Sequence, residues 1–248
     1  MPPSKASSMV RRHFEVGETA VTILAEEDYI DLAKDSIFRS REEIQRYIAS
    51  DPLFKDTLEP YRAGKGAPDI IRRMCGAASK ASVGPMAAVA GAIAQQAVWA
   101  MVSAGATHAV VDNGGDIAMF LSEDVDVGIY AGASSIRDLG LRFLGEKRHY
   151  SVCTSSGTVG PSISFGIADA AIVLAEDAAL ADACATRLGN DIQVDEEEGM
   201  LYAIDLVLRV PGVDGALVVV GDRMAMMGKV PELVKVRFDE TSITHIEL

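Results

Sequence analysis

The sequence predicts an α+β fold with mixed or antiparallel sheets and a long buried helix. Apolar residues make up 49% of the 248 residues, which is enough for a sizeable core in one large domain or two small ones. Helical and strand patterns alternate irregularly, without the βαβ rhythm that a doubly wound sheet requires. Residues 81–111 contain no Asp, Glu, Lys or Arg, which favours a buried helix in that stretch.

The first third of the chain predicts a hairpin and two helices. Thr19–Leu24 is apolar and β-branched, so we expect a strand there, in a hairpin within residues 10–34. Residues 37–48 carry apolar side chains on one helical face, and Asp51 and Pro52 end this segment. Pro68 suits the first turn of a second helix. That helix has one apolar side, made by Ile70, Ile71, Met74 and Ala78.

A third helix is predicted between Pro85 and Gly105, where about 20 residues span roughly 30 Å. The segment is apolar nearly all round, so a membrane span is the alternative to a buried helix. We favour the buried helix, because the stretch is mostly Ala and Gly and carries Gln95 and Gln96 at its middle.

The remaining elements are mostly strands. We expect a hydroxyl-rich loop over residues 151–167 and a helix over 177–188 that Gly189 and Asn190 end. A hairpin is expected over residues 216–227, with Gly221 and Asp222 as its turn. Strands are predicted at 108–111, 117–121, 125–131, 139–152 and 167–175.

Charge and cysteine content exclude several classes of function. The formal net charge is −13 and no cluster of Lys or Arg exceeds a pair, so a nucleic-acid partner is not expected. The three cysteines are too few and too scattered for a disulfide framework, which favours a reducing cytoplasm. Residues 1–17 show no signal-peptide pattern, so we expect a cytoplasmic protein with no membrane partner.

Common catalytic signatures fail on inspection. Residues 140–147 misplace the lysine of a P-loop, and residues 221–229 have the wrong glycine spacing. GxGxxG and GxSxG are absent, and no Ser–His–Asp triad can be argued from the sequence. The acidic run Asp195–Glu198 is expected to be a solvated loop.

One motif with chemical potential is the turn Asn113–Asp116. Gly114 and Gly115 allow a backbone to approach a ligand closely and to expose N–H groups, while Asn113 and Asp116 can bind polar groups. An ordinary Asn-Gly hairpin turn is the alternative interpretation.

A second motif is Ala181–Thr186 on a predicted helix. Asp182 and Thr186 are four residues apart and lie on one face, so a carboxylate and a hydroxyl could bind a hard cation together. The alternative is an alanine-rich core helix whose threonine is satisfied within the protein.

Taken in order, these motifs resemble the ApbE-like superfamily, which includes the FAD:protein FMN transferases. The resemblance rests on Asn113–Asp116, Thr154–Gly157 and Ala181–Thr186, and covers roughly residues 65–190. It implies a single ApbE-like domain over residues 1–248, built of tandem α+β subdomains with a flavin dinucleotide in the cleft between them.

The resemblance also implies a site. A flavin, FAD or FMN, is expected at Gly84, at the turn and at the Ser/Gly loop, and Mg²⁺ at Asp182 and Thr186. The expected flavin-binding residues are Gly84, Asn113, Gly114, Gly115, Asp116, Ser155, Ser156 and Gly157. The implied chemistry is Mg²⁺-dependent transfer of FMN to a protein Thr or Ser, with AMP leaving.

Two departures leave other functions open. Transferases of this family carry a Lys-Gly pair where this chain has Ser82–Pro85, and a histidine segment where it has Pro161–Gly166. The chain most resembles an uncharacterised cytoplasmic branch found in archaea and anaerobic bacteria. The alternatives are an accessory protein for another ligand, with a suggested link to anaerobic sulfur assimilation and homocysteine formation, and a non-catalytic homo-oligomeric scaffold.

Overall fold

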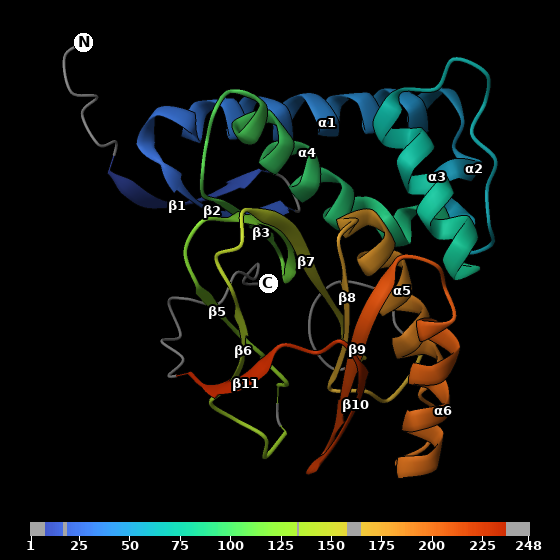
Figure 1. Ribbon diagram of the computed structural model, residues 1–248. Coiled ribbons are helices and arrows are strands. Elements are labelled where there is room, and N and C mark those ends of the chain that lie inside the picture. Colours follow the sequence, from blue (N-terminus) through green and yellow to red (C-terminus); the bar gives the residue numbers. More distant parts are fainter. Residues whose placement is uncertain (1–7, 17–18, 133, 158–164, 237–248) are drawn as a thin grey trace.

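A large antiparallel sheet runs through the molecule in the computed structural model, which describes residues 8–16, 19–132, 134–157 and 165–236. Its strand order is β1-β2-β3-β4-β7-β8-β9-β10, and all its pairs are antiparallel (Figure 1). These strands are β1 (Met9–Val16), β2 (Thr19–Glu26), β3 (Ala109–Asn113), β4 (Asp116–Leu121), β7 (Arg148–Ser155), β8 (Ala170–Ala175), β9 (Val213–Val220) and β10 (Arg223–Gly228).

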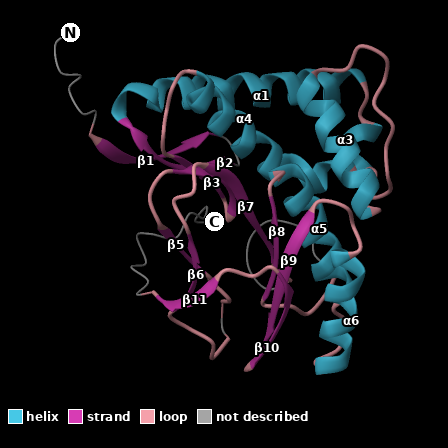
Figure 2. Cartoon of the chain, in the orientation of Figure 1, coloured by secondary structure: helices cyan, strands magenta, loops and turns pink. Residues whose placement is uncertain are grey.

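A small sheet and a set of helices cover the two faces of this large sheet (Figure 2). The small sheet has the order β11-β6-β5 and is also antiparallel. Its strands are β5 (Val125–Gly128), β6 (Leu139–Phe143) and β11 (Glu232–Lys235). The α+β fold predicted from the sequence is thereby confirmed.

The helices pack on the opposite face from the small sheet. The short ones are η1 (Glu27–Tyr29), α2 (Leu53–Asp56) and η2 (Pro85–Ala88). The longer ones are α1 (Ile30–Ser50), α3 (Asp69–Ala81), α4 (Val89–Ser103), α5 (Ala178–Asp191) and α6 (Glu197–Leu208).

Strand β8 lies at the centre of the core and is buried along its whole length. Ala171, Val173 and Ala175 pack against the helices, whereas Ile172 and Leu174 pack toward the small sheet. Successive side chains of a strand point to opposite faces, so a strand covered on both sides needs a continuous apolar run. This explains why residues 170–175 show no polar alternation.

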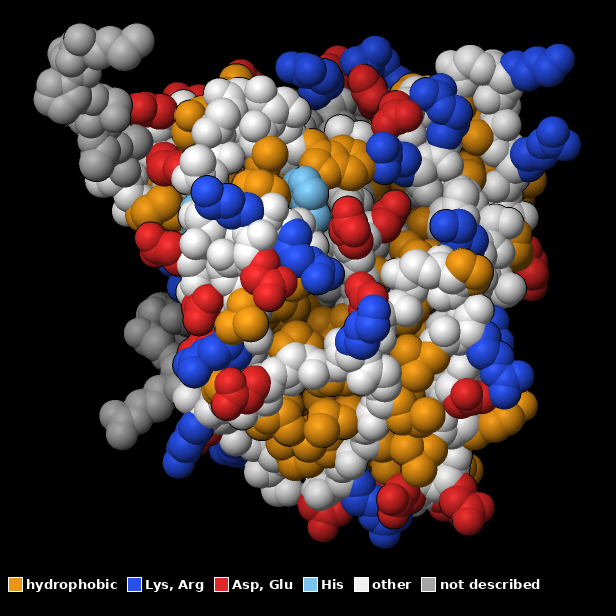
Figure 3. Space-filling model, in the orientation of Figure 1, with side chains coloured by type: hydrophobic (Ala, Val, Ile, Leu, Met, Phe, Trp, Pro, Cys, Tyr) orange, Lys and Arg blue, Asp and Glu red, His pale blue; other side chains and the backbone are white. Residues whose placement is uncertain are grey.

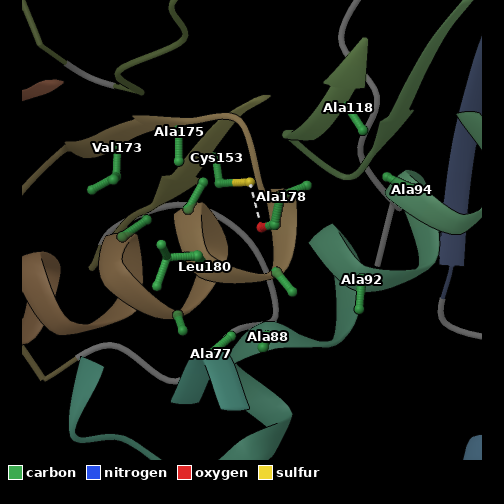
Figure 4. Close-up of a cluster of buried hydrophobic side chains, with 14 of the residues drawn as sticks. Ala77, Ala88, Ala92, Ala94, Ala118, Cys153, Val173, Ala175, Ala178 and Leu180 are labelled. Carbon is green, nitrogen blue, oxygen red and sulfur yellow. Dashed lines mark hydrogen bonds between the residues drawn. The ribbon is translucent and has the colours of Figure 1, made fainter. Parts of the chain in front are cut away.

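The predicted long helix is broken near its start, where η2 gives way to α4 at Ala88. Pro85–Ser103 is long and apolar enough to cross a membrane, but half of it is buried inside the protein. It packs against α1, α5, β3 and β4, as a core helix of a soluble protein does. Small side chains pack between these elements: Ala88 of η2 lies beside Ala77 of α3, and Ala94 of α4 lies near Ala118 of β4 (Figure 4).

Several predicted boundaries were wrong. Residues 139–152 form two strands, because the chain turns at Gly145 and at Lys147, whose φ is +55°. The hydroxyl-rich loop was wrong for 151–155, which belong to β7, and its residues 158–164 lie outside the described part. The strand predicted at 125–131 ends at Gly128.

The helix boundaries also differ in places. Helix α1 begins at Ile30, earlier than predicted, and α5 continues past Gly189 to Asp191. The acidic run is exposed, as expected, but its last two residues begin α6. Helix α6 was not predicted, although its buried residues Met200, Ala203, Ile204 and Val207 have helical spacing.

Candidate functional site

The turn between β3 and β4 has the glycine conformation that its sequence predicts. Gly114 and Gly115 have φ of +67° and +98°, and the Gly115 N–H donates to Asp112 Oδ1 at 2.8 Å. A Cβ atom added to either glycine would meet no atom within 4 Å, so space is open beside both. A two-residue turn with positive φ at both positions is the common hairpin geometry, and the open space leaves its backbone accessible to a ligand.

Side chains from β3 and α5 hold the first turn of α4. Asn113 Nδ2 donates to the Ala90 carbonyl at 3.0 Å, and the Gly91 N–H donates to Asp182 Oδ2 at 2.9 Å. The first N–H groups of a helix lack partners within the helix, so a carboxylate placed there stabilises it. Asn113 and Asp182 therefore both fix the start of α4.

Helix α4 in turn supports the start of α5 through Gln95. The Ala178 N–H donates to Gln95 Oε1 at 3.0 Å, and Gln95 Nε2 donates to the Glu176 carbonyl at 3.2 Å. Ser151 Oγ donates to the same carbonyl at 3.1 Å. The first turns of α4 and α5 thus donate backbone hydrogen bonds to side chains of the opposite helix, which fixes Asp182 relative to α4.

Gly91 is needed where these two helices meet. A Cβ atom at this position would lie 2.2 Å from the Ala178 carbonyl oxygen and 2.9 Å from Asp182 Cβ. Only glycine permits this approach, which allows the Gly91 N–H to reach the carboxylate.

Two carboxylates lie on the helix side of the sheet, where Asp182 is buried and Asp116 is partly buried. Asp116 on β4 is paired in register with Cys153 on β7, so their side chains point to the same face. Asp182 approaches that face from α5, and its presence raises the pKa of Asp116 by repulsion. Asp116 Oδ1 is buried and has no hydrogen-bond partner among the described residues.

Burial is the main cause of the raised pKa values in this cluster. It raises the pKa of Asp182 to about 7, against the lowering effect of the Gly91 and Ala90 amides. Burial also raises the pKa of Asp116 well above the ordinary value. It raises the pKa of the Cys153 thiol as well, and both carboxylates add to this rise because they repel the thiolate. Cys153 lies against α5, with its sulfur 3.5 Å from the Ala178 carbonyl oxygen (Figure 4). Neither carboxylate forms an ion pair with a described basic side chain. Asp182 is instead stabilised by hydrogen bonds from the Gly91 and Ala90 amides, and Asp116 by hydrogen bonds from Cys153 and the Thr154 amide.

The donor set fits a hard cation only in part. Carboxylate oxygens are preferred ligands of Mg²⁺, and the unpartnered Asp116 Oδ1 is available. Thr186, one turn beyond Asp182, is partly buried and could add a hydroxyl. Within the described ranges, however, no three His, Cys, Asp or Glu side chains are placed to hold a metal together. A cation here would also need hydroxyl, backbone, water or ligand oxygens.

The Ser/Gly loop begins at the end of β7. Ser155 and Ser156 are buried, and Ser155 lies two residues beyond Cys153, on the same face of the strand. Gly157 donates its N–H to the Ala168 carbonyl at 2.9 Å, and a Cβ there would lie 2.1 Å from the Gly166 oxygen. The glycine thus allows two loop segments to pack closely.

Gly84 is placed at the junction of α3 and η2. A Cβ atom at Gly84 would lie 2.0 Å from the Thr57 carbonyl oxygen, so the chain needs glycine there for packing. This is a structural reason for the residue, independent of any ligand.

The structure therefore brings Asn113, Asp116 and Asp182 together around the start of α4. Sequence reasoning missed Gly91, Gln95 and Cys153, whose partners are distant in sequence. The signal for Gln95 is a polar side chain inside a helix without charged residues, a feature that also argues against a membrane span.

Comparisons with known sequences give consistent matches over nearly the whole chain. A family model described as "AbpE bacteria" matches residues 3–203. A UPF0280 protein from Methanocella arvoryzae is 49% identical over 231 residues, covering 93% of this chain and 94% of that protein. One from Methanosarcina acetivorans is 48% identical over 236 residues, covering 95% and 93%.

Solved structures with a similar fold include flavin transferases. A variant of the flavin transferase ApbE from Vibrio cholerae aligns with a TM-score of 0.57 and 13% identity, covering 89% of this chain and 97% of that one. The apo form of the flavinyl transferase ApbE from Pseudomonas stutzeri aligns with a TM-score of 0.53 and 12% identity, covering 89% and 94%. At this identity the likeness concerns the fold.

Proposed function

The chain belongs to the ApbE-like superfamily, in the family of the UPF0280 proteins, and from this premise we propose that it binds a flavin nucleotide, FAD or FMN, together with Mg²⁺. The observation that carries the proposal is the pair Asp116 and Asp182 beside the start of α4, two neighbouring carboxylates without a basic partner among the described residues. A divalent cation would offset both negative charges and would attract the phosphates of a nucleotide. The flavin transferases with a similar fold support the choice of ligand.

In this proposal each group of residues has a distinct task. Asp182 and Thr186 hold Mg²⁺, and Asp116, whose charge interacts with that of Asp182, adds a carboxylate oxygen. The open backbone of Gly114 and Gly115 faces the ligand. The other proposed flavin-binding residues are Ser155, Ser156 and Gly157 at the end of β7 and Gly84 at the start of η2. Asn113 positions the first turn of α4, because its side-chain amide donates a hydrogen bond to the Ala90 carbonyl.

If the chain is catalytic, it transfers FMN from FAD to a Thr or Ser hydroxyl of an acceptor protein. The hydroxyl oxygen bonds to the FMN phosphorus, the P–O bond to AMP breaks, AMP leaves and the hydroxyl proton is released. Bound Mg²⁺ would stabilise the charge that develops on the pyrophosphate. The three described cysteines are free and buried, which supports a cytoplasmic location.

A second function remains in contention because of two sequence departures. Ser82–Pro85 holds no basic residue, and Pro161–Gly166 holds no histidine, where the transferases carry a lysine and a histidine. These changes favour an accessory protein that uses the same site for a different nucleotide-like ligand.

A thermal-shift panel separates these functions. FAD, FMN, ATP and NAD are each added with and without Mg²⁺, and we expect a flavin to raise the melting temperature, with a larger rise when Mg²⁺ is present. A shift with ATP or NAD alone would favour the accessory protein. No shift with any of the four would contradict nucleotide binding and leave the oligomeric scaffold.

A further inference from the structure

A hollow opens between the large sheet and the small one. Its volume is about 330 Å³, and it is lined by β6, β7, β8 and the segment 229–232 that precedes and begins β11. Arg148, at its edge, begins β7, whereas Ser155 ends that strand about 23 Å away at the usual rise per residue. The mouth of the hollow thus lies at the opposite end of β7 from Ser155, although its lining residue Ser151 is only two residues from Cys153.

The interior of this hollow is apolar. Phe143, Leu174, Val230 and Pro231 line it, and Leu144 is 49% exposed at its mouth. Figure 3 shows hydrophobic side chains gathered on this side of the molecule, over β9, β10 and β11, within a frame of charged ones. The volume is at the lower end of the range of about 300–1,000 Å³ that is typical of small-molecule sites.

Two cations at the mouth keep free hydrogen-bond donors. Arg148 reaches Glu146 only at 4.0 Å, and Lys229 reaches Asp214 only at 3.9 Å, both at the outer limit of an ion pair. The Arg148 guanidinium lies over the Tyr150 ring, 4.7 Å from its centre, so that its edge remains open. Both side chains are more than half exposed.

The other charged groups at the mouth are more firmly engaged. Arg142 binds Asp126 through two hydrogen bonds of 2.8 Å. Glu146 accepts a hydrogen bond from the Tyr150 hydroxyl at 3.1 Å. Asp214 and Glu232 also line the hollow and add negative charges, which favours a ligand with one negative charge over a polyanion.

We propose that this hollow binds a small amphipathic monoanion, a medium-chain or aryl carboxylate. Its apolar body would lie between the two sheets, against Leu174 and Val230, and its carboxylate would accept hydrogen bonds from Arg148 and Lys229. An apolar interior with a few polar groups at its mouth is typical of small-molecule sites. The proposal does not depend on flavin binding.

Calorimetric titration with three eight-carbon probes tests this proposal. Octanoate, octanol and octylammonium share the apolar body and differ in charge. We expect octanoate to bind saturably, and the double variant R148E/K229E to lose about tenfold in affinity for octanoate while its affinity for octanol is unchanged. Arg209→Glu serves as the matched control, because Arg209 pairs with Asp205 on α6, does not line the hollow, and should leave octanoate binding intact.

The variant Val230→Trp tests the apolar body by filling the hollow, and should abolish binding of octanoate and octanol alike. Circular dichroism of each variant checks that it folds, and R148E/K229E changes only exposed side chains. The proposal is overturned if octanoate does not bind, if the three probes bind equally, or if the double variant retains wild-type affinity. The flavin and Mg²⁺ panel is run on the same variants, so failure of one proposal is distinguishable from failure of the other.

Discussion

Asp182 performs two structural tasks that conflict electrostatically. Its Oδ2 accepts a hydrogen bond from Gly91 and so stabilises the start of α4, yet its charge is buried beside Asp116. The raised pKa of about 7 shows that desolvation outweighs the helix amides. Substitution by Asn keeps an oxygen for the Gly91 N–H and removes the charge, so the effect of the hydrogen bond can be separated from that of the charge.

We predict that Asp182→Asn changes the pH dependence of stability in metal-free protein. The pKa of Asp182 is about 7 in the folded chain against an ordinary value of 3.8, so folding takes up a proton between these pH values. The stabilising contribution of this group is complete below pH 3.8 and is lost as pH rises through 7. Between pH 5 and pH 8 the melting temperature should fall less for D182N than for wild type. D182N should therefore be more stable than wild type at pH 8. A lower stability of D182N at pH 8 would contradict an uncompensated charge.

Mg²⁺ should reverse the order of stability at pH 8. We expect it to raise the melting temperature of wild type and to leave D182N unchanged, because a charged ligand is lost. Thr186→Val should reduce the effect only partly, since a hydroxyl is a weaker oxygen donor than a carboxylate. An equal response of D182N and wild type would remove Asp182 from the metal site.

At the level of elements, the site depends on how closely α4 and α5 approach each other. Gln95 and Asp182 each accept a backbone hydrogen bond from the opposite helix, and Gly91 allows the two helices to approach this closely. Local patterns in the sequence predicted α3, α5 and the β9–β10 hairpin, because caps, periodicity and turn glycines are local. They could not predict the contacts of Gly91 or Gln95, since their partners are more than 80 residues away.

We predict that Gly91→Ala destabilises the protein by about 1–3 kcal/mol, the usual cost of overpacking. The added methyl would collide with the Ala178 carbonyl, 2.2 Å away, and push α5 with Asp182 from its place. Gly76→Ala in α3 is the matched control, because no atom lies within 4 Å of the added Cβ and Ala favours helix. Urea unfolding measures both variants. Equal stability of G91A and G76A would show that the helices separate at little cost.

At the level of the whole molecule, one sheet connects two hydrophobic clusters. The helix-side cluster and the cluster beneath the small sheet share β8, whose alternate residues belong to one or the other. A strand that both clusters need should couple their unfolding. We therefore expect residues 1–248 to unfold as a single cooperative unit.

This coupling can be tested with Ile172→Val, which removes a methylene from the inter-sheet cluster and should cost about 1 kcal/mol. Trp99, the one tryptophan of the chain, reports on the helix side, where Arg73 stacks over its ring at 4.0 Å. In a single unit, the urea midpoint from Trp99 fluorescence shifts as much as the midpoint from circular dichroism, although the substitution lies across the sheet. An unshifted Trp99 transition, with a biphasic dichroism curve, would show that the two sides of the sheet unfold separately.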